Sequence, residues 1–188
     1  MNSIMQPMAL VTFLRGVNVG GHRTFRPSVL ANELKDYGVV NIGAAGTFVF
    51  RKRVSRTRLR CELLRCLPFE AQVMICTGEE LIAAALDNPF GGEPDGPETV
   101  RFVSVLARRP RVLPSIPLRL PANGRWVVKI LSTQGRFVFG VYRREMKAIG
   151  LLGQIDKLLG VSVTTRNWNT VASILKVLEK KASNRDSQ

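Results

Sequence analysis

The amino-acid sequence predicts an α+β fold with mostly antiparallel sheets, in which a ferredoxin-like βαββαβ unit comes first. Two observations lead to this class. Between residues 8 and 76, apolar residues follow strand and helix spacing in the order β-α-β-β-α-β. Beyond a glycine- and proline-rich loop at 88–99, a second set of strands ends in one amphipathic helix. The first unit should therefore form a four-stranded antiparallel sheet with both helices on one face.

Short apolar runs and helix-capping residues define the elements of the first unit. Pro27 suits a first helical turn and Gly38 suits a helix end. Ser55 is placed to cap a second helix, which stops before Pro68. We therefore expect helices at 27–37 and 56–67, and strands at 8–14, 39–43, 47–51 and 69–76.

A third helix should follow the first unit directly. Thr77 and Glu80 have the spacing of a capping box, in which each side chain bonds to the other residue's backbone N–H group. The sequence therefore predicts a helix at 78–87.

The second half contains strands, one irregular segment and a closing helix. Prolines recur between residues 108 and 124, and they are incompatible with regular structure in that segment. The other patterns predict a strand at 100–107, a β-hairpin from 126–131 and 136–142, a helical or irregular stretch at 145–159, and a closing helix at 168–181.

This order predicts two subdomains. The loop at 88–99 is the expected boundary, because its glycines and prolines interrupt both periodic patterns. We expect a ferredoxin-like subdomain at 8–88, a second α+β subdomain at 100–181, and a frayed tail at 182–188.

The composition is strongly basic. Lysine and arginine number 28 against 14 aspartate and glutamate residues, which gives a formal net charge of +14. A field of this sign attracts polyanions, and arginine suits bidentate contact with phosphate and carboxylate groups. A solvated basic surface with no anionic partner is the other interpretation, and the composition leaves both open.

Several chemistries are excluded or not indicated. Three cysteines and one histidine, His22, match neither a disulfide framework nor a common zinc spacing, so we expect no metal site and no cofactor. The amino terminus lacks the pattern of a signal peptide, and no window reaches the ~20 apolar residues of a membrane span. We therefore expect a soluble, cytoplasmic protein with reduced cysteines and no membrane partner. No pattern indicates an oligomeric state, and no catalytic residue is assigned.

The loop after the first strand resembles a phosphate-binding P-loop only in its glycine spacing. Gly16 and Gly21 are correctly spaced, but the lysine and hydroxyl positions hold His22 and Arg23, which excludes nucleotide hydrolysis. A tight turn, with glycine and Asn18 in left-handed geometry, explains the same residues. Contact between an anion and the exposed backbone N–H groups is the second interpretation.

A second polar segment, TTRNWNT at 164–170, precedes the closing helix. Thr165 or Asn167 can cap that helix by accepting a hydrogen bond from a backbone N–H group. One residue suffices for a cap, and this segment offers several polar side chains beyond it. The excess favours a polar binding site at the helix amino terminus, with an extended cap as the alternative.

The segments LRGVNVGG and TTRNWNT, together with a glycine followed by a Val-Phe strand near residue 48, resemble the bacterial family called domain of unknown function 1697. The resemblance spans roughly residues 8–178. It implies a fold of two intertwined α+β subdomains, the first of them ferredoxin-like, in agreement with the order of elements above. It implies no reaction, because no activity is established for the family.

One short segment departs from the pattern of that family. Relatives usually read Ser-Gly-Asn where this chain has Ala45, Gly46 and Thr47. If the hydroxyl and amide groups serve a site in the relatives, that site is altered here.

Three functional hypotheses follow. The first is a small anionic ligand, bound where the two motifs meet, by Arg15, Asn18, His22, Arg166, Asn167 and Asn169. The second is nucleic acid, bound by the basic segment at 51–60 through Arg51, Lys52, Arg53, Arg56, Arg58 and Arg60. The third is a structural or protein-interaction module whose motifs only maintain the fold.

The second hypothesis has a variant that uses the sheet itself. Ferredoxin-like sheets that recognise RNA stack bases on aromatic residues of their central strands. Phe48 and Phe50 would lie on one face of such a strand, but the RNA-binding consensus is met only in part. We therefore interpret both phenylalanines as core residues.

Overall fold

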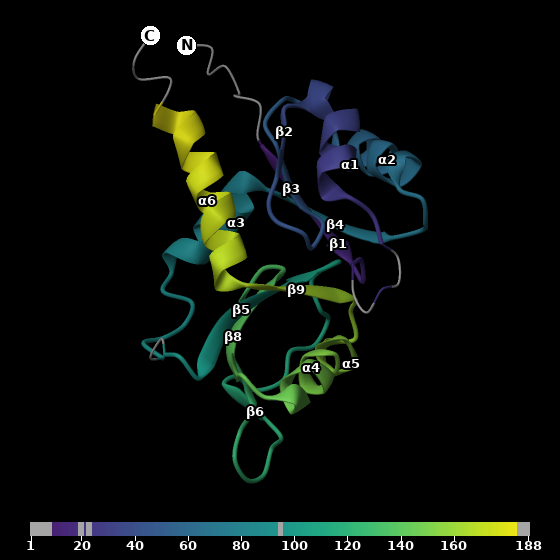
Figure 1. The fold of residues 1–188 in the computed structure, drawn as a ribbon. Helices are drawn as coiled ribbons and strands as arrows, with labels where there is room; N and C mark the ends of the chain where they lie inside the picture. The colour runs from purple at the N-terminus through teal and green to yellow at the C-terminus, as the bar shows by residue number, and fades with distance from the viewer. Residues whose placement is uncertain (1–8, 19–20, 22–23, 94–95, 184–188) are drawn as a thin grey trace. The chain divides into compact units, whose positions relative to one another are not determined.

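The computed structural model describes most of the chain, and its helices and strands are labelled in Figure 1. The described residues are 9–18, 21, 24–93 and 96–183. Within these ranges, no helix combines the length and the apolar character needed to cross a membrane.

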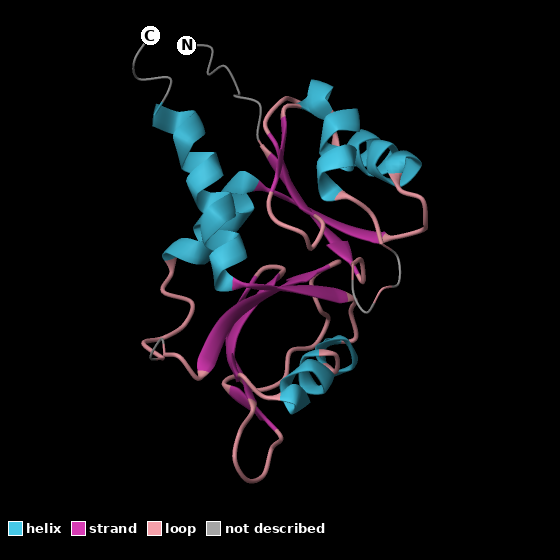
Figure 2. Cartoon of the chain, viewed as in Figure 1, coloured by secondary structure: helices cyan, strands magenta, loops and turns pink. Residues whose placement is uncertain are grey.

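The chain divides into two compact units, and each combines helices with an antiparallel sheet (Figure 2). The first unit contains the chain up to Ile82 and again from Ser173 onward, whereas the second contains Ala83–Ala172. The expected α+β class is confirmed. The last five residues of the expected tail lie outside the described residues.

The sheet of the first unit has the ferredoxin-like arrangement. Its order is β2-β3-β1-β4, and every neighbouring pair is antiparallel. The βαββαβ prediction is therefore confirmed in both connectivity and strand order. The strands are β1 (Leu10–Arg15), β2 (Val39–Asn41), β3 (Thr47–Phe50) and β4 (Gln72–Thr77).

Two helices and one 3-10 turn cover one face of this sheet. Leu30 and Leu34 from the first helical segment, and Leu59 and Leu63 from the second, pack with Leu10 and other sheet residues in one core. The helix expected at 27–37 is interrupted at Leu34, and Gly38 ends the turn in left-handed geometry. These elements are α1 (Pro27–Glu33), η1 (Lys35–Tyr37) and α2 (Arg56–Cys66), with Ser55 capping α2 as expected.

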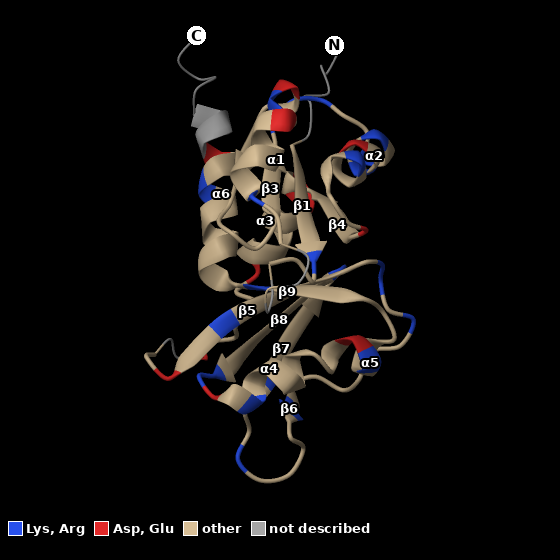
Figure 3. Cartoon of the chain, turned by 45° about the vertical axis from the view of Figure 1, so that its right-hand side comes forward, with Lys and Arg blue, Asp and Glu red and all other residues tan. Residues whose placement is uncertain are grey.

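The opposite face of β1 is buried as well. Val11 and Phe13 have no exposed surface, and their cross-strand partners Val49 and Met74 are also buried. The start of α3 (Gly78–Leu86) and the end of α6 (Trp168–Ser183) belong to this unit and lie on the side of the sheet opposite α1 and α2 (Figures 1 and 3). The face that could have been a binding platform is therefore core.

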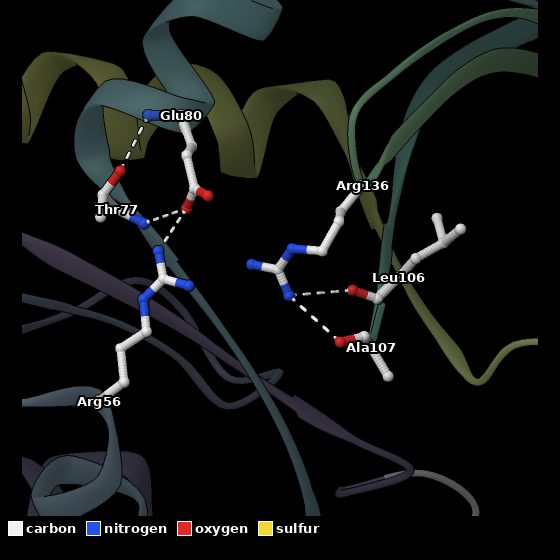
Figure 4. Close-up of polar contacts among 6 residues, drawn as sticks. All are labelled: Arg56, Thr77, Glu80, Leu106, Ala107 and Arg136. Atoms are coloured by element: carbon white, nitrogen blue, oxygen red, sulfur yellow. Dashed lines mark hydrogen bonds and ion pairs between the residues drawn. The ribbon is translucent and has the colours of Figure 1, made fainter. Parts of the chain in front are cut away.

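A complete capping box starts α3, as the sequence predicts (Figure 4). The Thr77 backbone N–H donates to Glu80 Oε2 at 2.8 Å, and the Glu80 N–H donates to Thr77 Oγ1 at 3.0 Å. The same carboxylate oxygen accepts a hydrogen bond from Arg56 Nη2 at 2.8 Å. The cap therefore also links α3 to the first turn of α2.

The second unit contains a five-stranded antiparallel sheet in the order β6-β7-β8-β5-β9. The expected hairpin is confirmed as β7 and β8, with a register shift between Ile130 and Ser132. A side chain at Gly140 would overlap the Lys129 carbonyl and the Phe102 ring, so this position of β8 requires glycine. The strands are β5 (Thr99–Leu106), β6 (Leu118–Leu120), β7 (Val128–Gln134), β8 (Phe137–Arg143) and β9 (Val163–Asn167).

The expectation of no regular structure between residues 108 and 124 is wrong at one place. β6 lies there and pairs with β7, with Leu118 opposite Ile130. Pro117 and Pro121 immediately flank this three-residue strand, and β6 is at the edge of the sheet. An edge strand needs hydrogen bonds on one side only, so prolines at its ends remove none that the ladder requires.

Helices cover one face of the second sheet. The stretch that the sequence left as helical or irregular contains α4 (Met146–Leu152) and α5 (Ile155–Leu159), and Gly160 ends α5 in left-handed geometry. Ala148, Ile155 and Leu159 are buried in the same core as Phe102.

At the end of β5, Arg136 Nη1 donates to the carbonyls of Leu106 and Ala107 at 3.3 Å each (Figure 4).

The glycine- and proline-rich loop is fastened to the second sheet. Two polar side chains of β7, and the side chain of the residue that follows β8, donate hydrogen bonds to backbone carbonyls or to a carboxylate of this loop. These contacts join Ser132 to the Pro89 carbonyl at 2.6 Å, Lys129 to Glu93 at 2.6 Å, and Arg144 to the Pro97 carbonyl at 2.8 Å. The glycine and proline content of this segment predicts a loop, but it does not predict these long-range hydrogen bonds.

The capping box gives the first testable prediction. Replacing Thr77 by alanine should lower the free energy of unfolding by about 1 kcal/mol, because a helical N–H group loses its acceptor. Thr77→Ser keeps the hydroxyl and is the control. Chemical denaturation of both variants provides the measurement, and equal losses in the two would contradict the role assigned to the hydroxyl.

Candidate functional site

The loop that follows β1 is a turn built on left-handed residues. Gly16 has φ of 66° and Asn18 has φ of 53°, as the turn interpretation expects. The next helix begins only at Pro27, which is too far along the chain for a P-loop. His22, one of the proposed ligand contacts, lies outside the described residues.

The Asn18 side chain joins the two sides of this loop. Its Nδ2 donates to the Ala44 carbonyl at 2.8 Å, and its Oδ1 accepts from the Phe25 N–H at 2.9 Å. One amide therefore holds three segments of the chain, those around residues 18, 25 and 44. Asn18 therefore has a structural role. The sequence analysis proposed it as a ligand contact and did not predict this role.

The segment that departs from the family pattern packs directly against this loop. The Leu14 N–H donates to the Gly46 carbonyl at 2.8 Å, and Gly46 has φ of 68°. A Cβ atom on Gly46 would lie 2.8 Å from Val17 and 2.9 Å from Leu14, closer than real contacts allow. Gly46 is thus required both by its backbone angle and by close packing. Thr47, at the altered position, is fully buried.

Arg15 ends β1 beside a polar cavity of about 520 Å³. Its Nη1 donates to Gln72 Oε1 at 2.9 Å across the β1–β4 pair. The described residues that line the cavity are Arg15, Gly16, Glu70, Ala71 and Gln72. Two residues of the RGVNVGG motif therefore border a space of the size that small ligands occupy.

The cations of the basic segment at 51–60 are all exposed, and some of them also contact other groups. Arg56 and Arg60 are engaged, with the Glu80 carboxylate and with the Val73 carbonyl at 2.8 Å each. Figure 3 shows basic residues on α2, whose first turn contains no acidic residue. Arg51, Lys52, Arg53 and Arg58 are exposed.

Phe48 and Phe50 are core residues, as interpreted from the sequence. Neither side chain has exposed surface, and both pack against the face of the sheet that α1 and α2 cover. Bases stack on the exposed face of RNA-binding sheets of this class. These phenylalanines are therefore unable to serve as a stacking platform.

The closing motif, the segment TTRNWNT at 164–170, contains a buried arginine. Arg166 lies on β9, is 8% exposed, and donates from Nη1 to Thr164 Oγ1 and to the Thr165 carbonyl at 2.9 Å each. Burial lowers the pKa of Arg166 to about 10. The guanidinium still carries its charge at neutral pH, so its hydrogen bonds offset part of the cost of burying a cation.

The other polar residues of the closing motif differ in their contacts. Asn167 Oδ1 accepts from the Thr170 N–H at 2.9 Å, so Asn167 is the cap of α6. Thr165, the other candidate for the cap, instead shares a hydrogen bond of 2.7 Å with Ser104 on β5. Asn169 is exposed in the first turn of α6. The sequence interpretation missed the strand in this segment, because polar residues predominate in it.

No metal site is found in the parts of the chain that the structure describes. Within those parts, histidine, cysteine, aspartate and glutamate do not form a group of three or more that would hold an ion.

The fold and its two motif segments define an α+β protein with a ferredoxin-like first unit and a second antiparallel unit. The chain belongs to the family described as protein of unknown function, DUF1697, whose model matches residues 8–120. The solved structure of the conserved bacterial protein SP0830 from Streptococcus pneumoniae is similar to it, with a TM-score of 0.58 and 17% identity. The similarity covers 91% of this chain and 98% of that one, and it shows a shared fold. No curated protein matches the sequence.

The role of Asn18 gives a second prediction. Asn18→Ala should lower the free energy of unfolding by about 1–3 kcal/mol, because the part-buried Phe25 N–H loses its acceptor. Asn18→Asp keeps the acceptor and tolerates the left-handed angle, so it should cost less. Urea denaturation compares the two variants. If alanine is tolerated as well as aspartate, the amide does not hold the loop.

Proposed function

We propose that this protein binds a small anionic ligand in the cavity beside Arg15. The observation that carries the proposal is the position of the RGVNVGG motif, because Arg15 and Gly16 both line that cavity. Arg15 supplies a permanent positive charge with several donors, and one of these donors contacts the neutral side chain of Gln72. Glu70 and Gln72 add groups that accept hydrogen bonds from hydroxyl or amino substituents of the same ligand.

The ligand is expected to be a phosphorylated or carboxylated metabolite that also carries hydroxyl groups. A lining that places a cation, a carboxylate and an amide side by side suits such a mixed molecule better than a simple ion. Binding, with no assigned reaction, is what these groups support. The participation of Arg166, Asn167 and Asn169 from the closing motif stays a prediction.

The third prediction tests Arg15. A thermal-shift screen of sugar phosphates and hydroxy acids, followed by calorimetric titration of any active compound, should identify a ligand of the wild-type protein. Arg15→Ala should weaken its binding by about tenfold or more, since a hydrogen bond to a charged group contributes about 1.5–3 kcal/mol. Arg26→Ala removes an exposed arginine elsewhere in the same unit and is the matched control.

Two results would overturn the proposal. One is the absence of binding by every compound in the screen, and the other is equal affinity in the Arg15→Ala and Arg26→Ala variants. Asn169→Ala belongs in the same titration, because Asn169 is exposed and is not the cap of α6. A loss of affinity in that variant would extend the site to the closing motif.

Nucleic-acid binding by the segment at 51–60 is a second candidate function. It is favoured by the exposure of Arg51, Lys52, Arg53 and Arg58 in a chain with a net charge of +14. Cations at the amino terminus of α2 also oppose the helix dipole, and an anionic backbone nearby would relieve that repulsion. The buried phenylalanines leave phosphate contact, without base stacking, as the mode of binding.

The fourth prediction separates the two candidates. In a fluorescence-anisotropy titration with duplex DNA, the logarithm of the affinity should fall linearly with the logarithm of the salt concentration. Substituting Arg51, Lys52 and Arg53 together by alanine should reduce that slope by about 0.9 for each phosphate that the variant no longer neutralises. Arg15→Ala, which tests the small-ligand site, should change the slope less. An affinity that is indifferent to salt would exclude this candidate.

A further inference from the structure

The second unit contains a cavity that none of the sequence motifs includes. It has a volume of about 560 Å³ and lies between α4 and the segment that joins β6 to β7. Its size falls within the range of small-molecule sites. The residues that line it are Pro121, Arg125, Val127, Glu145, Lys147, Gly150, Leu151 and Gln154.

Apolar side chains form part of the lining, and two more are exposed on α4. Pro121, Val127 and Leu151 contribute apolar side chains to the cavity. On the same helix, Met146 and Ile149 are 85% and 70% exposed, a high degree for large apolar residues. A ligand with an apolar part would have these side chains available on the same helix as the cavity.

The charged groups of the lining are predominantly positive. Arg125 and Glu145 form an ion pair of 3.3 Å, so the carboxylate is already neutralised by a cation of the same lining. Lys147 is exposed, and its side chain forms no hydrogen bond or ion pair with any residue that the structure describes. The cavity therefore offers an apolar surface together with one cation that is not engaged.

We propose that this cavity binds a small amphiphilic carboxylate, such as a medium-chain fatty acid, with its apolar chain against Val127 and Leu151 and its carboxylate at Lys147. Charge complementarity selects an anionic head group, and a second copy of a chain with a net charge of +14 is a poor occupant. The proposal is independent of the ligand site at Arg15, because none of the described residues lines both cavities.

Gly150 makes the site directly testable. It lies within α4, lines the cavity, and a Cβ atom built on it meets no other atom within 4 Å. Because Gly150 lines the cavity and has space around it, a large side chain at this position should reduce the room left for the ligand. Alanine and leucine both favour helix more than glycine does, so Gly150→Ala and Gly150→Leu should preserve α4.

The experiment is calorimetric titration with decanoate below its micelle concentration. Wild type and Gly150→Ala should bind it, whereas Gly150→Leu should lose about tenfold or more in affinity. Lys147→Ala should weaken binding a few-fold, and Lys157→Ala, which removes an exposed lysine from α5, should not. Thermal melting of each variant verifies that it is folded.

Decylamine and anionic phospholipid vesicles complete the test. Decylamine has the same chain with a positive head group and should bind more weakly than decanoate. The proposal is overturned if decanoate does not bind, if Gly150→Leu binds it as well as Gly150→Ala does, or if decylamine binds equally. Binding to the vesicles with none to free decanoate would also overturn it and would identify α4 as a membrane-surface contact instead.

Discussion

The burial of β1 on both faces is the constraint on which the first unit depends. Leu10 and Leu14 face the core under α1 and α2, while Val11 and Phe13 are fully buried on the other side. A strand without a solvated face needs cover from two directions. The ferredoxin-like unit supplies cover on one side, and the chain from Ser173 belongs to the same unit and lies on the other. The return of the closing helix follows from this requirement.

The turn at the end of β1 combines three parts of the chain in one structure. The Leu14 N–H bonds to Gly46, the Asn18 amide bonds to Ala44 and Phe25, and Gly46 leaves no room for a side chain between Val17 and Leu14. Residues that a pattern marks as functional can therefore be required by the fold. Arg15 differs from them, because its side chain borders a cavity.

The many arginines of this chain occupy different electrostatic environments. Arg166 is buried and held by a hydroxyl and a carbonyl, Arg56 shares a carboxylate with a helix cap, and the cations at 51–53 are exposed. Burying a cation costs free energy unless its donors are hydrogen-bonded or paired. Exposed ones contribute long-range attraction that salt screens. A net charge of +14 is therefore compatible with structural and binding roles in the same molecule.

The sequence by itself determined the order of elements in the first unit, the capping box at Thr77 and Glu80, and the β7–β8 hairpin, because each depends on residues close together in the chain. It did not identify β6 or β9, since both are edge strands, one flanked by prolines and the other rich in polar residues. Only the tertiary structure decided that Asn18 bonds across the loop, that Arg166 is buried, and that Gly150 borders a cavity. Those properties arise from contacts between distant segments, and local periodicity does not specify such contacts.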